Sequence, residues 1–462
     1  MKPISYFPWP GRTGCALLAG GWLLLGAGSL HAQTQPTYET EPVTLASGVQ
    51  TNLGSTHIIA FTQTLQAAVG TPVVRVHFTN YNLGRRSYVR ITSLKDQRSQ
   101  QLDARRMAQW NDTSALLNGN RVTVELHVAP GEQGIYIHAD QIIKNCLNCG
   151  DLAQGRGLPE TLCGPDTRVA STDNRVGRIS GCTAWLISNG GVLTAGHCAP
   201  LGGVFEVFVP ASDSDGSPNA SDPDDQFPIV TPANVAQNNG TGDDYAVFLL
   251  NPDNLGRRAH DRLGFFRVTR TVPANGTTMR VTGFGIDDTP VGTGGGRNAQ
   301  NRTLQTSTGP YVSETTSGAN DIFHSYAVDT EPANSGSPII WNVNGFAIGI
   351  HTHGGCNGDG SGSNAGTSFN HATLRAAMDD LPGVNTFYLD NVIYPGSPAE
   401  TGNLFFPDHN LTAVYNHTPS GGKISIVEGN YPAATVGNTG VFGTGNKSVL
   451  LVAPVGTVTI GN

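Results

Sequence analysis

The sequence predicts an all-β protein with more than one domain, and three observations lead to that prediction. Short apolar runs recur along the chain, and most are bounded by Gly, Asn or Pro. The 462 residues include 59 Gly and 28 Pro but only 13% charged residues, while 38% are apolar. This composition can build cores and favours turn-rich β structure over helical bundles or disorder. A chain of this length has room for two or three domains.

The first 32 residues predict an export signal. Lys2 and Arg12 precede an apolar run over residues 16–30, and the small residue Ala32 follows. A basic start, a short apolar stretch and a small residue before the cut are typical of secretory signal peptides. A membrane anchor is the rival interpretation, but the run is short for a span. We therefore expect a secreted, extracellular protein without membrane contact once the signal is removed.

Charge and cysteine content limit the kinds of partner, metal and cofactor that we expect. The net charge is −8 and no run of Lys or Arg stands out, so we expect no nucleic-acid partner. Cys15 would leave with the signal, and the even number of remaining cysteines favours disulfides in an exported protein. Cys146 and Cys149 form a CxxC without a second CxxC or a paired His motif, so a local disulfide is expected there rather than a metal site. We expect no cofactor.

Residues 33–150 predict a β-sandwich-like module, either a propeptide or a retained accessory domain. Apolar and polar side chains alternate over strand lengths at 73–84, 87–94 and 121–128, with Asn and Gly turns between them. Residues 104–110 predict one short helix.

Residues 151–168 have no periodicity and many turn residues, which indicates a linker. Arg156 and Arg168 are the expected processing points. At the other end, residues 395–462 repeat a strand, a Gly/Pro turn and a second strand. That pattern predicts a short β-rich tail resembling rungs of a parallel β-helix.

Residues 169–394 form the largest predicted domain and are again dominated by short strands. Five apolar runs indicate them: CTAWLI, YAVFLL, MRVTGFG, PIIW and FAIGIHTH. One helix is predicted at 371–381, because Leu374, Ala377, Met378 and Leu381 recur at helical spacing.

Three residues within this domain, His197, Asp244 and Ser335, are candidates for a catalytic site. His197 follows an apolar strand and is bracketed by Cys182 and Cys198, whose disulfide would fix the backbone around it. Asp244 begins an apolar run, so it is expected to be buried and to need a partner such as a His N–H.

The neighbouring Asp243 is expected to face solvent. Ser335 lies in a run of small residues that can expose a hydroxyl and aim backbone N–H groups at one point, whereas Ser337 is expected to be structural. The chain order His, Asp, Ser is that of chymotrypsin-type enzymes.

Residues from about 160 to 390 resemble trypsin/chymotrypsin-fold serine endopeptidases, and specifically the bacterial V8-like glutamyl endopeptidase branch. The matching motifs are LTAGHC at 193–198, DYAV at 244–247, VTGFG at 281–285, NSGSP at 334–338 and GIHTHGG at 349–355. The resemblance implies a chymotrypsin-like double β-barrel, with two six-stranded barrels and the active site between them. It also implies a zymogen whose substrates are proteins or peptides. We expect a monomer.

The resemblance assigns roles to single residues. Ser335 would attack the scissile carbonyl, His197 would act as general base and acid, and Asp244 would orient the imidazole. The N–H groups of Ala333 and Ser335 would form the oxyanion hole. The family usually has Gly at position 333, and we predict that Ala333 keeps a negative φ, helped by the stiffness of Pro332.

The expected substrate pocket contains Asp329, Thr330 and His351. His351 matches the residue with which glutamyl endopeptidases bind a substrate Glu, so cleavage after Glu or Asp is expected. Asp329 would instead favour Arg or Lys if it were ionised at the pocket base. His353 would take the role of His351 in the pocket if the register of this strand against the family motif differed by two residues.

Two alternatives in other classes stay open: a non-catalytic binding protein on a protease scaffold, and an esterase. We also predict a Cys163–Cys356 disulfide. The loop 212–226 contains five Asp and is expected to be a solvated acidic insertion, with a calcium loop as the alternative.

Overall fold

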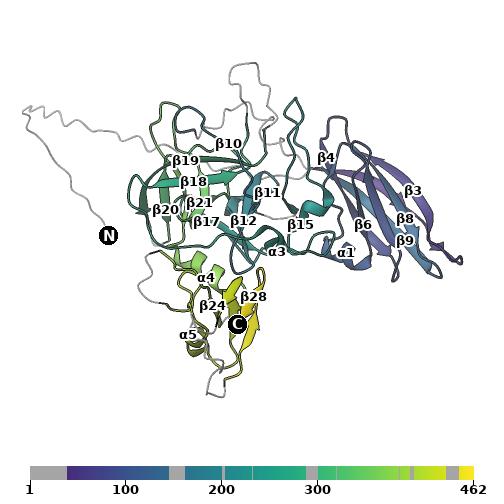
Figure 1. Cartoon of the computed structure of the whole chain (residues 1–462). Coiled ribbons are helices and arrows are strands. Elements are labelled where there is room, and N and C mark those ends of the chain that lie inside the picture. Colours follow the sequence, from purple (N-terminus) through teal and green to yellow (C-terminus); the bar gives the residue numbers. More distant parts are fainter. Residues whose placement is uncertain are drawn as a thin grey trace, which may run out of the picture. The chain divides into compact units, whose positions relative to one another are not determined.

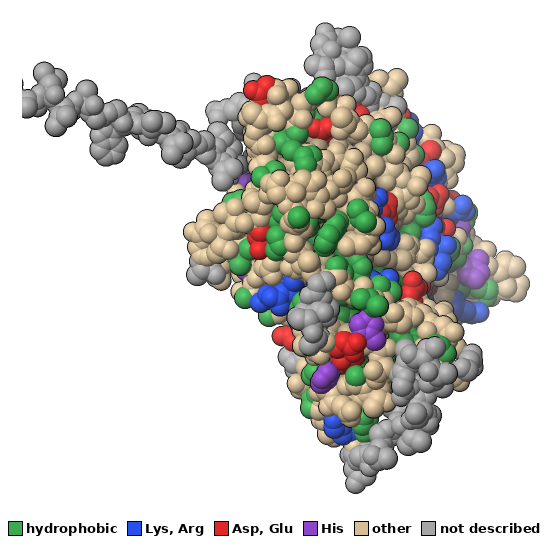
Figure 2. Space-filling view, turned by 60° about the vertical axis from the view of Figure 1, so that its left-hand side comes forward, with side chains coloured by type: hydrophobic (Ala, Val, Ile, Leu, Met, Phe, Trp, Pro, Cys, Tyr) green, Lys and Arg blue, Asp and Glu red, His purple; other side chains and the backbone are tan. Residues whose placement is uncertain are grey.

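The computed structural model is all-β, as predicted (Figure 1). The residues that it describes are 39–144, 162–199, 203–231, 233–287, 300–318, 320–383, 385–395, 400–432 and 447–461. The predicted signal segment, Cys146, Cys149 and Arg156 lie outside them. No described helix has both the length and the hydropathy of a transmembrane span. On the face shown in Figure 2, charged side chains are scattered between broad areas of backbone and uncharged polar groups.

The N-terminal module is a sandwich of two antiparallel sheets. One sheet has the order β1-β9-β4-β7, with β2 also paired to β9, and the other has the order β3-β8-β5-β6. From Arg121 to Leu126 in β8 the side chains at alternate positions are buried, which matches the alternation in the sequence, whereas His127 and Val128 are both buried. The elements are β1 (Glu39–Ala46), β2 (Gln50–Thr51), β3 (Ile58–Gln66), β4 (Val73–Asn82), β5 (Tyr88–Ser93), β6 (Ser99–Leu102), α1 (Ala104–Gln109), β7 (Leu117–Asn118), β8 (Arg121–Val128) and β9 (Gln133–Lys144).

The first sheet of the protease region is a curled half-barrel with the order β15-β14-β11-β12-β13-β17-β16. Pro228 in β15 has no N–H to donate, which suits the edge position of that strand. The elements are β11 (Val176–Ile179), β12 (Cys182–Leu186), β13 (Val192–Thr194), η1 (Gly196–Cys198), β14 (Val204–Glu206), η2 (Pro223–Asp225), β15 (Gln226–Pro228), β16 (Val235–Asn238), β17 (Asp244–Phe248) and α3 (Ala259–Leu263).

The second sheet closes into a six-strand barrel, because β19 pairs with both β18 and β20. We expected two closed barrels, whereas strand pairing among the described residues closes only this one. The elements are β10 (Val169–Ala170), β18 (Thr278–Gly283), β19 (Gln305–Thr316), β20 (Ile322–Tyr326), β21 (Pro338–Trp341), β22 (Ala347–His353) and β23 (Asn364–Ser368).

The C-terminal region stacks short strands in parallel, as the repeated strand-turn-strand pattern predicts. The strand β25 pairs in parallel with β24 and β27, and β26 pairs in parallel with β28. This region contacts the protease sheets closely: the Arg267 guanidinium lies 2.7 Å from the Asp390 carboxylate. The elements are α4 (Ala372–Asp380), β24 (Thr386–Leu389), α5 (Leu411–His417), β25 (Lys423–Ile426), β26 (Gly429–Tyr431), β27 (Leu450–Val452) and β28 (Val458–Ile460).

Candidate active site

His197 lies on η1, directly after β13, and its side chain is buried. The predicted disulfide between Cys182 and Cys198 is formed, with a Cα–Cα distance of 6.2 Å, and it joins β12 to this turn. Gly196 allows the turn to pack closely, because a Cβ there would lie 1.6 Å from the carbonyl oxygen of Gln237. The backbone that carries His197 is therefore held from two sides.

Asp244 and His197 meet as the sequence predicts. One carboxylate oxygen accepts a hydrogen bond from the backbone N–H of His197 at 2.9 Å, and the other lies 2.6 Å from Nδ1. Nδ1 thus carries the proton of the neutral ring, which leaves Nε2 as the basic nitrogen. Nε2 is buried and has no hydrogen-bond partner among the described residues. The imidazole is arranged to take up a proton at Nε2.

Asp244 is positioned by a residue that the sequence did not indicate. The Thr367 hydroxyl on β23 donates to the Asp244 carbonyl at 2.8 Å, and the Asp244 N–H lies 3.3 Å from the same hydroxyl. Thr367 thereby connects the closed barrel to the first residue of β17. Threonine is common in strands, so no local pattern distinguishes this one.

Asp243 does not face solvent, which corrects our expectation. Its carboxylate lies 3.1 Å from Nε2 of His371 and accepts a hydrogen bond from Asn239 at 2.8 Å. The ring of His371 also caps α4, because Nδ1 accepts the N–H of Leu374. Asp243 is buried because the start of α4 packs over the turn before β17, a long-range contact that sequence spacing does not reveal.

Ser335 belongs to the turn before β21 and approaches the first sheet. Its carbonyl accepts a hydrogen bond from the Thr183 N–H at 2.9 Å. The next residue, Gly336, has a φ of 90°, and a Cβ there would lie 2.2 Å from the Thr194 hydroxyl. Since β12 and β13 contact this turn, the structure brings Ser335 to the sheet that carries His197 and Asp244.

Ala333 has a φ of 78°, so our prediction of a negative φ is wrong. The N–H of Asn334 donates to the carbonyl of Glu331 at 2.9 Å and closes a β-turn with Pro332 and Ala333 at its centre. A positive φ at the third position defines a type II turn, in which Pro is favoured at the second. Pro332 therefore stabilises the turn that strains Ala333. The Ala333 carbonyl is held by the Thr183 hydroxyl at 2.9 Å.

The Asp329 carboxylate, which we placed in the expected substrate pocket, is bound by donors from the start of the protease region. One carboxylate oxygen accepts the Cys163 N–H at 2.7 Å, and the other accepts the Thr167 N–H at 2.8 Å and the Thr167 hydroxyl. A carboxylate needs such donors when it is buried, and residues 163–167 provide them. Asp329 thus anchors the start of the protease region.

The same segment contains the second predicted disulfide. Cys163 and Cys356 are joined, and this bond ties the start of the protease region to the loop after β22. Arg168, which we expected as a processing point, has its side chain buried, paired with Asp166 at 2.7 Å and bonded to the carbonyl of Ile286. The Arg168 side chain is thus engaged within the folded protease region, whereas its neighbours Thr167 and Val169 are exposed.

Thr330 is buried next to Asn364, a residue that sequence reasoning missed. The Asn364 amide donates to the Thr330 hydroxyl at 3.0 Å and to the Val328 carbonyl at 2.8 Å. Its oxygen accepts the N–H groups of Gly355 and Cys356. One amide therefore holds the segment before the Ser335 turn against the loop after β22.

His351 and His353 lie two residues apart on β22, with a β-bulge in between. Nδ1 of His351 lies 2.6 Å from the Tyr326 hydroxyl, and burial together with the nearby rings of His353 and His197 lowers its pKa to about 3. The His353 ring lies 6.4 Å from that of His197, and burial lowers the pKa of His353 also. The structure thus gathers His351 and His353 beside His197.

One group of three side chains in the described chain has the spacing of a metal site: Cys182, His197 and Cys198 lie within 4.8 Å of one another. Both sulfur atoms belong to the disulfide, so no thiolate is available to bind a cation. This group is therefore explained by the disulfide beside the candidate general base.

The region that carries these residues matches a known family model. Residues 168–373 match the Trypsin family model, whereas a search of curated proteins finds no match. Similar solved structures include a Glu endopeptidase in complex with MPD, with 19% identity, 47% of this chain and 97% of that chain covered, and a TM-score of 0.34. The protease Anisep from Arthrobacter nicotinovorans has 18% identity, covers 46% and 99%, and has a TM-score of 0.32.

Mouse brain neuropsin has 17% identity, covers 45% of this chain and 96% of its own, and has a TM-score of 0.34. The family model spans β10 through to the start of α4, and it includes His197, Asp244 and Ser335. The match does not include the N-terminal module or the strands β24 to β28. Residues 168–373 are therefore similar to the trypsin family of serine proteases, and this match supports serine endopeptidase activity.

Proposed function

We propose that the protein is an exported serine endopeptidase that uses His197, Asp244 and Ser335 as its catalytic triad and cleaves after Glu or Asp. The triad assignment rests on two hydrogen bonds from His197 to Asp244. It also rests on Nε2 of His197, which is buried and has no hydrogen-bond partner among the described residues. A ring held in this tautomer is what a general base beside a serine needs.

The reaction would proceed through an acyl-enzyme. The Ser335 hydroxyl oxygen attacks the scissile carbonyl carbon while His197 Nε2 takes up the hydroxyl proton. The N–H groups of Ala333 and Ser335 would hold the oxyanion of the tetrahedral intermediate. His197 then protonates the leaving amine, and a water molecule repeats the sequence to release the acid and restore the Ser335 hydroxyl.

Support for an acidic substrate residue comes from the two histidines on β22. The low pKa of His351 means that it is uncharged near neutral pH in the free enzyme, so it offers a hydrogen bond and not a fixed charge. A carboxylate in this pocket would favour protonated His351 or His353, because a nearby negative charge raises a histidine pKa. We therefore expect the preference for Glu over Gln at the cleavage site to increase as the pH falls.

The alternative preference for Arg or Lys depends on a free acidic group in the pocket. Asp329 was the candidate, and its carboxylate instead accepts hydrogen bonds from Cys163 and Thr167. This contact favours the acidic preference over the basic one. The contact at Asp329 applies equally to a preference set by His351 and to one set by His353.

The catalytic proposal is tested with a fluorophosphonate probe on protein recovered from the medium of the producing cells, which also tests export. The wild type should be labelled and Ser335→Ala should not. Ser337→Ala is the matched control, because Ser337 is a buried serine two residues away in the same turn. Equal labelling of wild type and Ser335→Ala would refute the nucleophile assignment.

The preference is tested with three peptides that differ only in having Glu, Gln or Lys before the scissile bond. The Glu peptide should have the highest kcat/KM, and His351→Gln should reduce its advantage over the Gln peptide. A higher kcat/KM for the Lys peptide would replace this proposal with the trypsin-like alternative.

A further inference from the structure

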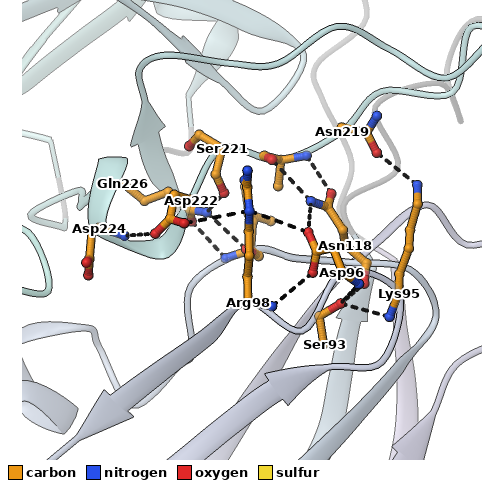
Figure 3. A network of polar contacts seen from close by, with 12 residues as sticks. Ser93, Lys95, Asp96, Arg98, Asn118, Asn219, Ser221, Asp222, Asp224 and Gln226 are labelled. Carbon is orange, nitrogen blue, oxygen red and sulfur yellow. Dashed lines mark hydrogen bonds and ion pairs between the residues drawn. The ribbon is translucent and has the colours of Figure 1, made fainter.

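Two side-chain amides connect the N-terminal module to the protease region (Figure 3). Gln226 accepts the N–H of Leu116 at 2.8 Å and donates to the carbonyl of the same residue at 2.9 Å. Asn118 accepts the N–H of Ala220 at 2.7 Å and donates to its carbonyl at 3.2 Å. Each amide thus pairs with both backbone groups of one residue across the boundary, as a neighbouring strand would.

Charged groups of the module face the acidic loop beside these amides. The Lys95 ammonium lies 2.8 Å from an Asp213 oxygen and 2.8 Å from the Asn219 side-chain oxygen. The Arg98 guanidinium lies 3.6 Å from the Asp222 carboxylate. Hydrogen bonds from Lys95 and then Asn219 lower the pKa of Asp213. We expected the loop 212–226 to be a solvated insertion. It is instead a surface on which the module lies.

The loop is held in place from the protease side as well. Arg178 and Glu206 form an ion pair between β11 and β14 with a shortest distance of 3.0 Å, and both side chains are buried. Arg178 also donates to the Asn219 carbonyl at 2.7 Å, while Glu206 accepts the Ser221 N–H at 3.1 Å. The surface that meets the module is thus shaped by contacts within the protease sheet.

Apolar packing and a second polar contact extend the interface. Val204 and Ala220 of the protease region belong to the same buried hydrophobic cluster as the core of the module. Elsewhere, Gln109 donates to the Pro252 carbonyl at 2.7 Å, and Asn251 donates to the Gln109 carbonyl at 2.8 Å. The contact therefore combines apolar packing with paired polar groups, the arrangement typical of stable interfaces.

The interface lies apart from the candidate active site. Its contacts in the protease region fall in 204–231 and 251–252, and within the described chain none of the hydrogen bonds or ion pairs across it involves the catalytic triad, His351 or His353. Separation would uncover the Gln226 amide and the backbone groups of Leu116 and Ala220. Buried polar groups that lose matched partners and apolar contacts are costly to separate.

We propose that the module, residues 39–144, stays bound to the protease as a non-covalent accessory subunit after the chain is cut between residues 144 and 162, and that it leaves the active site open. This goes beyond the proposed function, which does not decide whether the module is removed. The loop 212–226 is thus covered by the N-terminal module of the same chain.

The experiment uses the full chain with the Ser335→Ala change and a recognition site for a sequence-specific protease placed within 145–161. After complete cutting, the two fragments should elute together in size-exclusion chromatography at micromolar concentration. Lys95→Glu places like charges opposite each other and should weaken the complex about tenfold. Gln226→Ala leaves both backbone groups of Leu116 unpaired and should weaken it about 10- to 100-fold.

Two controls separate this interface from general effects of charge. Arg85→Glu reverses an exposed charge elsewhere on the module and should leave the complex unchanged. The double change Lys95→Glu with Asp213→Lys restores opposite charges and should recover binding. Separate elution of the fragments without any interface change, or equal binding in Lys95→Glu and Arg85→Glu, would overturn the proposal.

Access to the active site is tested with Ser335 intact. The cut protein should react with a fluorophosphonate probe in the fractions that still contain the module. Labelling confined to fractions that have lost the module would show that the module blocks the site. The co-elution experiment uses Ser335→Ala protein, so its outcome is independent of the proposed catalytic role.

Discussion

Asp244 holds His197 at two points, through the backbone N–H at 2.9 Å and through ring atom Nδ1 at 2.6 Å. A single hydrogen bond would leave the ring free to rotate about it. With both carboxylate oxygens engaged, the turn η1 and the ring are positioned by the same group. The orientation of the candidate general base therefore depends on one carboxylate at the start of β17.

Asp244→Asn should lower kcat by about 10⁴-fold without unfolding the protein, because an amide stabilises the wrong imidazole tautomer. The measurement is kcat on a peptide substrate, with circular dichroism to confirm folding. Asp243→Asn is the matched control, since Asp243 is the adjacent carboxylate and contacts His371 instead. The assignment would fail if both changes reduced kcat equally.

Ala333→Gly should stabilise the protein by up to about 1 kcal/mol. The positive φ of Ala333 costs about 1–2 kcal/mol, and the greater freedom of Gly in the unfolded chain offsets part of the gain. Urea unfolding of Ser335→Ala protein, which avoids self-digestion, measures the difference. Ala195→Gly is the control at a φ of −70° and should destabilise. If Ala333→Gly and Ala195→Gly destabilised the protein equally, the backbone at Ala333 would not be strained.

Asp329→Asn should destabilise the protein without changing the cleavage preference. The amide cannot accept all three hydrogen bonds from Cys163 and Thr167, and buried donors left unpaired cost about 1–3 kcal/mol each. Unfolding experiments and a peptide-library cleavage profile measure the two effects. A changed preference for the residue before the scissile bond would return Asp329 to the substrate pocket.

Asp379, near the end of α4, should contribute stability at low pH that is lost as the pH rises from about 4 to about 6. Burial raises the pKa of Asp379 to about 6, above the value of about 3.9 in an unfolded chain. The folded state therefore favours the protonated carboxyl, and this contribution is complete below pH 4 and lost above pH 6. Its size is on the order of 1–3 kcal/mol.

The free energy of unfolding measured at several pH values checks this prediction. Asp379→Asn should remove this contribution, so its stability relative to the wild type should increase from about pH 4 to about pH 6, and it keeps the oxygen that accepts the Leu404 N–H. The neighbouring Asp380 is exposed, so Asp380→Asn is the matched control and should retain the pH dependence. An unchanged profile in Asp379→Asn would show that its burial does not control the effect.

Local patterns in the sequence were enough to predict several of the strands and the helices α1 and α4, but not α3 or α5. Alternation places β8 at the predicted residues 121–128, and helical spacing places α4 within the predicted 371–381. Both patterns depend on neighbours a few residues away, and so they can be seen without the fold. The order of His197, Asp244 and Ser335 is likewise a property of the sequence.

Contacts between distant residues were decided only by the tertiary structure. Asp329 is bound by Cys163 and Thr167, and Asp243 by His371, and neither pair is marked by spacing or composition. A buried polar group takes the partner that the packing of other elements brings to it. Sequence reasoning therefore singled out these carboxylates but did not identify the partners of either one, and it wrongly placed Asp243 in solvent.

The sequence by itself determined several of the strand segments, where the candidate catalytic residues lie and which cysteines around His197 pair. The tertiary structure decided the φ of Ala333, the anchoring role of Asp329 and the contact of the module with the loop 212–226. The reason is physical: strand and helix patterns reflect interactions between near neighbours. Turn strain and the pairing of buried polar groups instead depend on atoms that only the folded chain brings together.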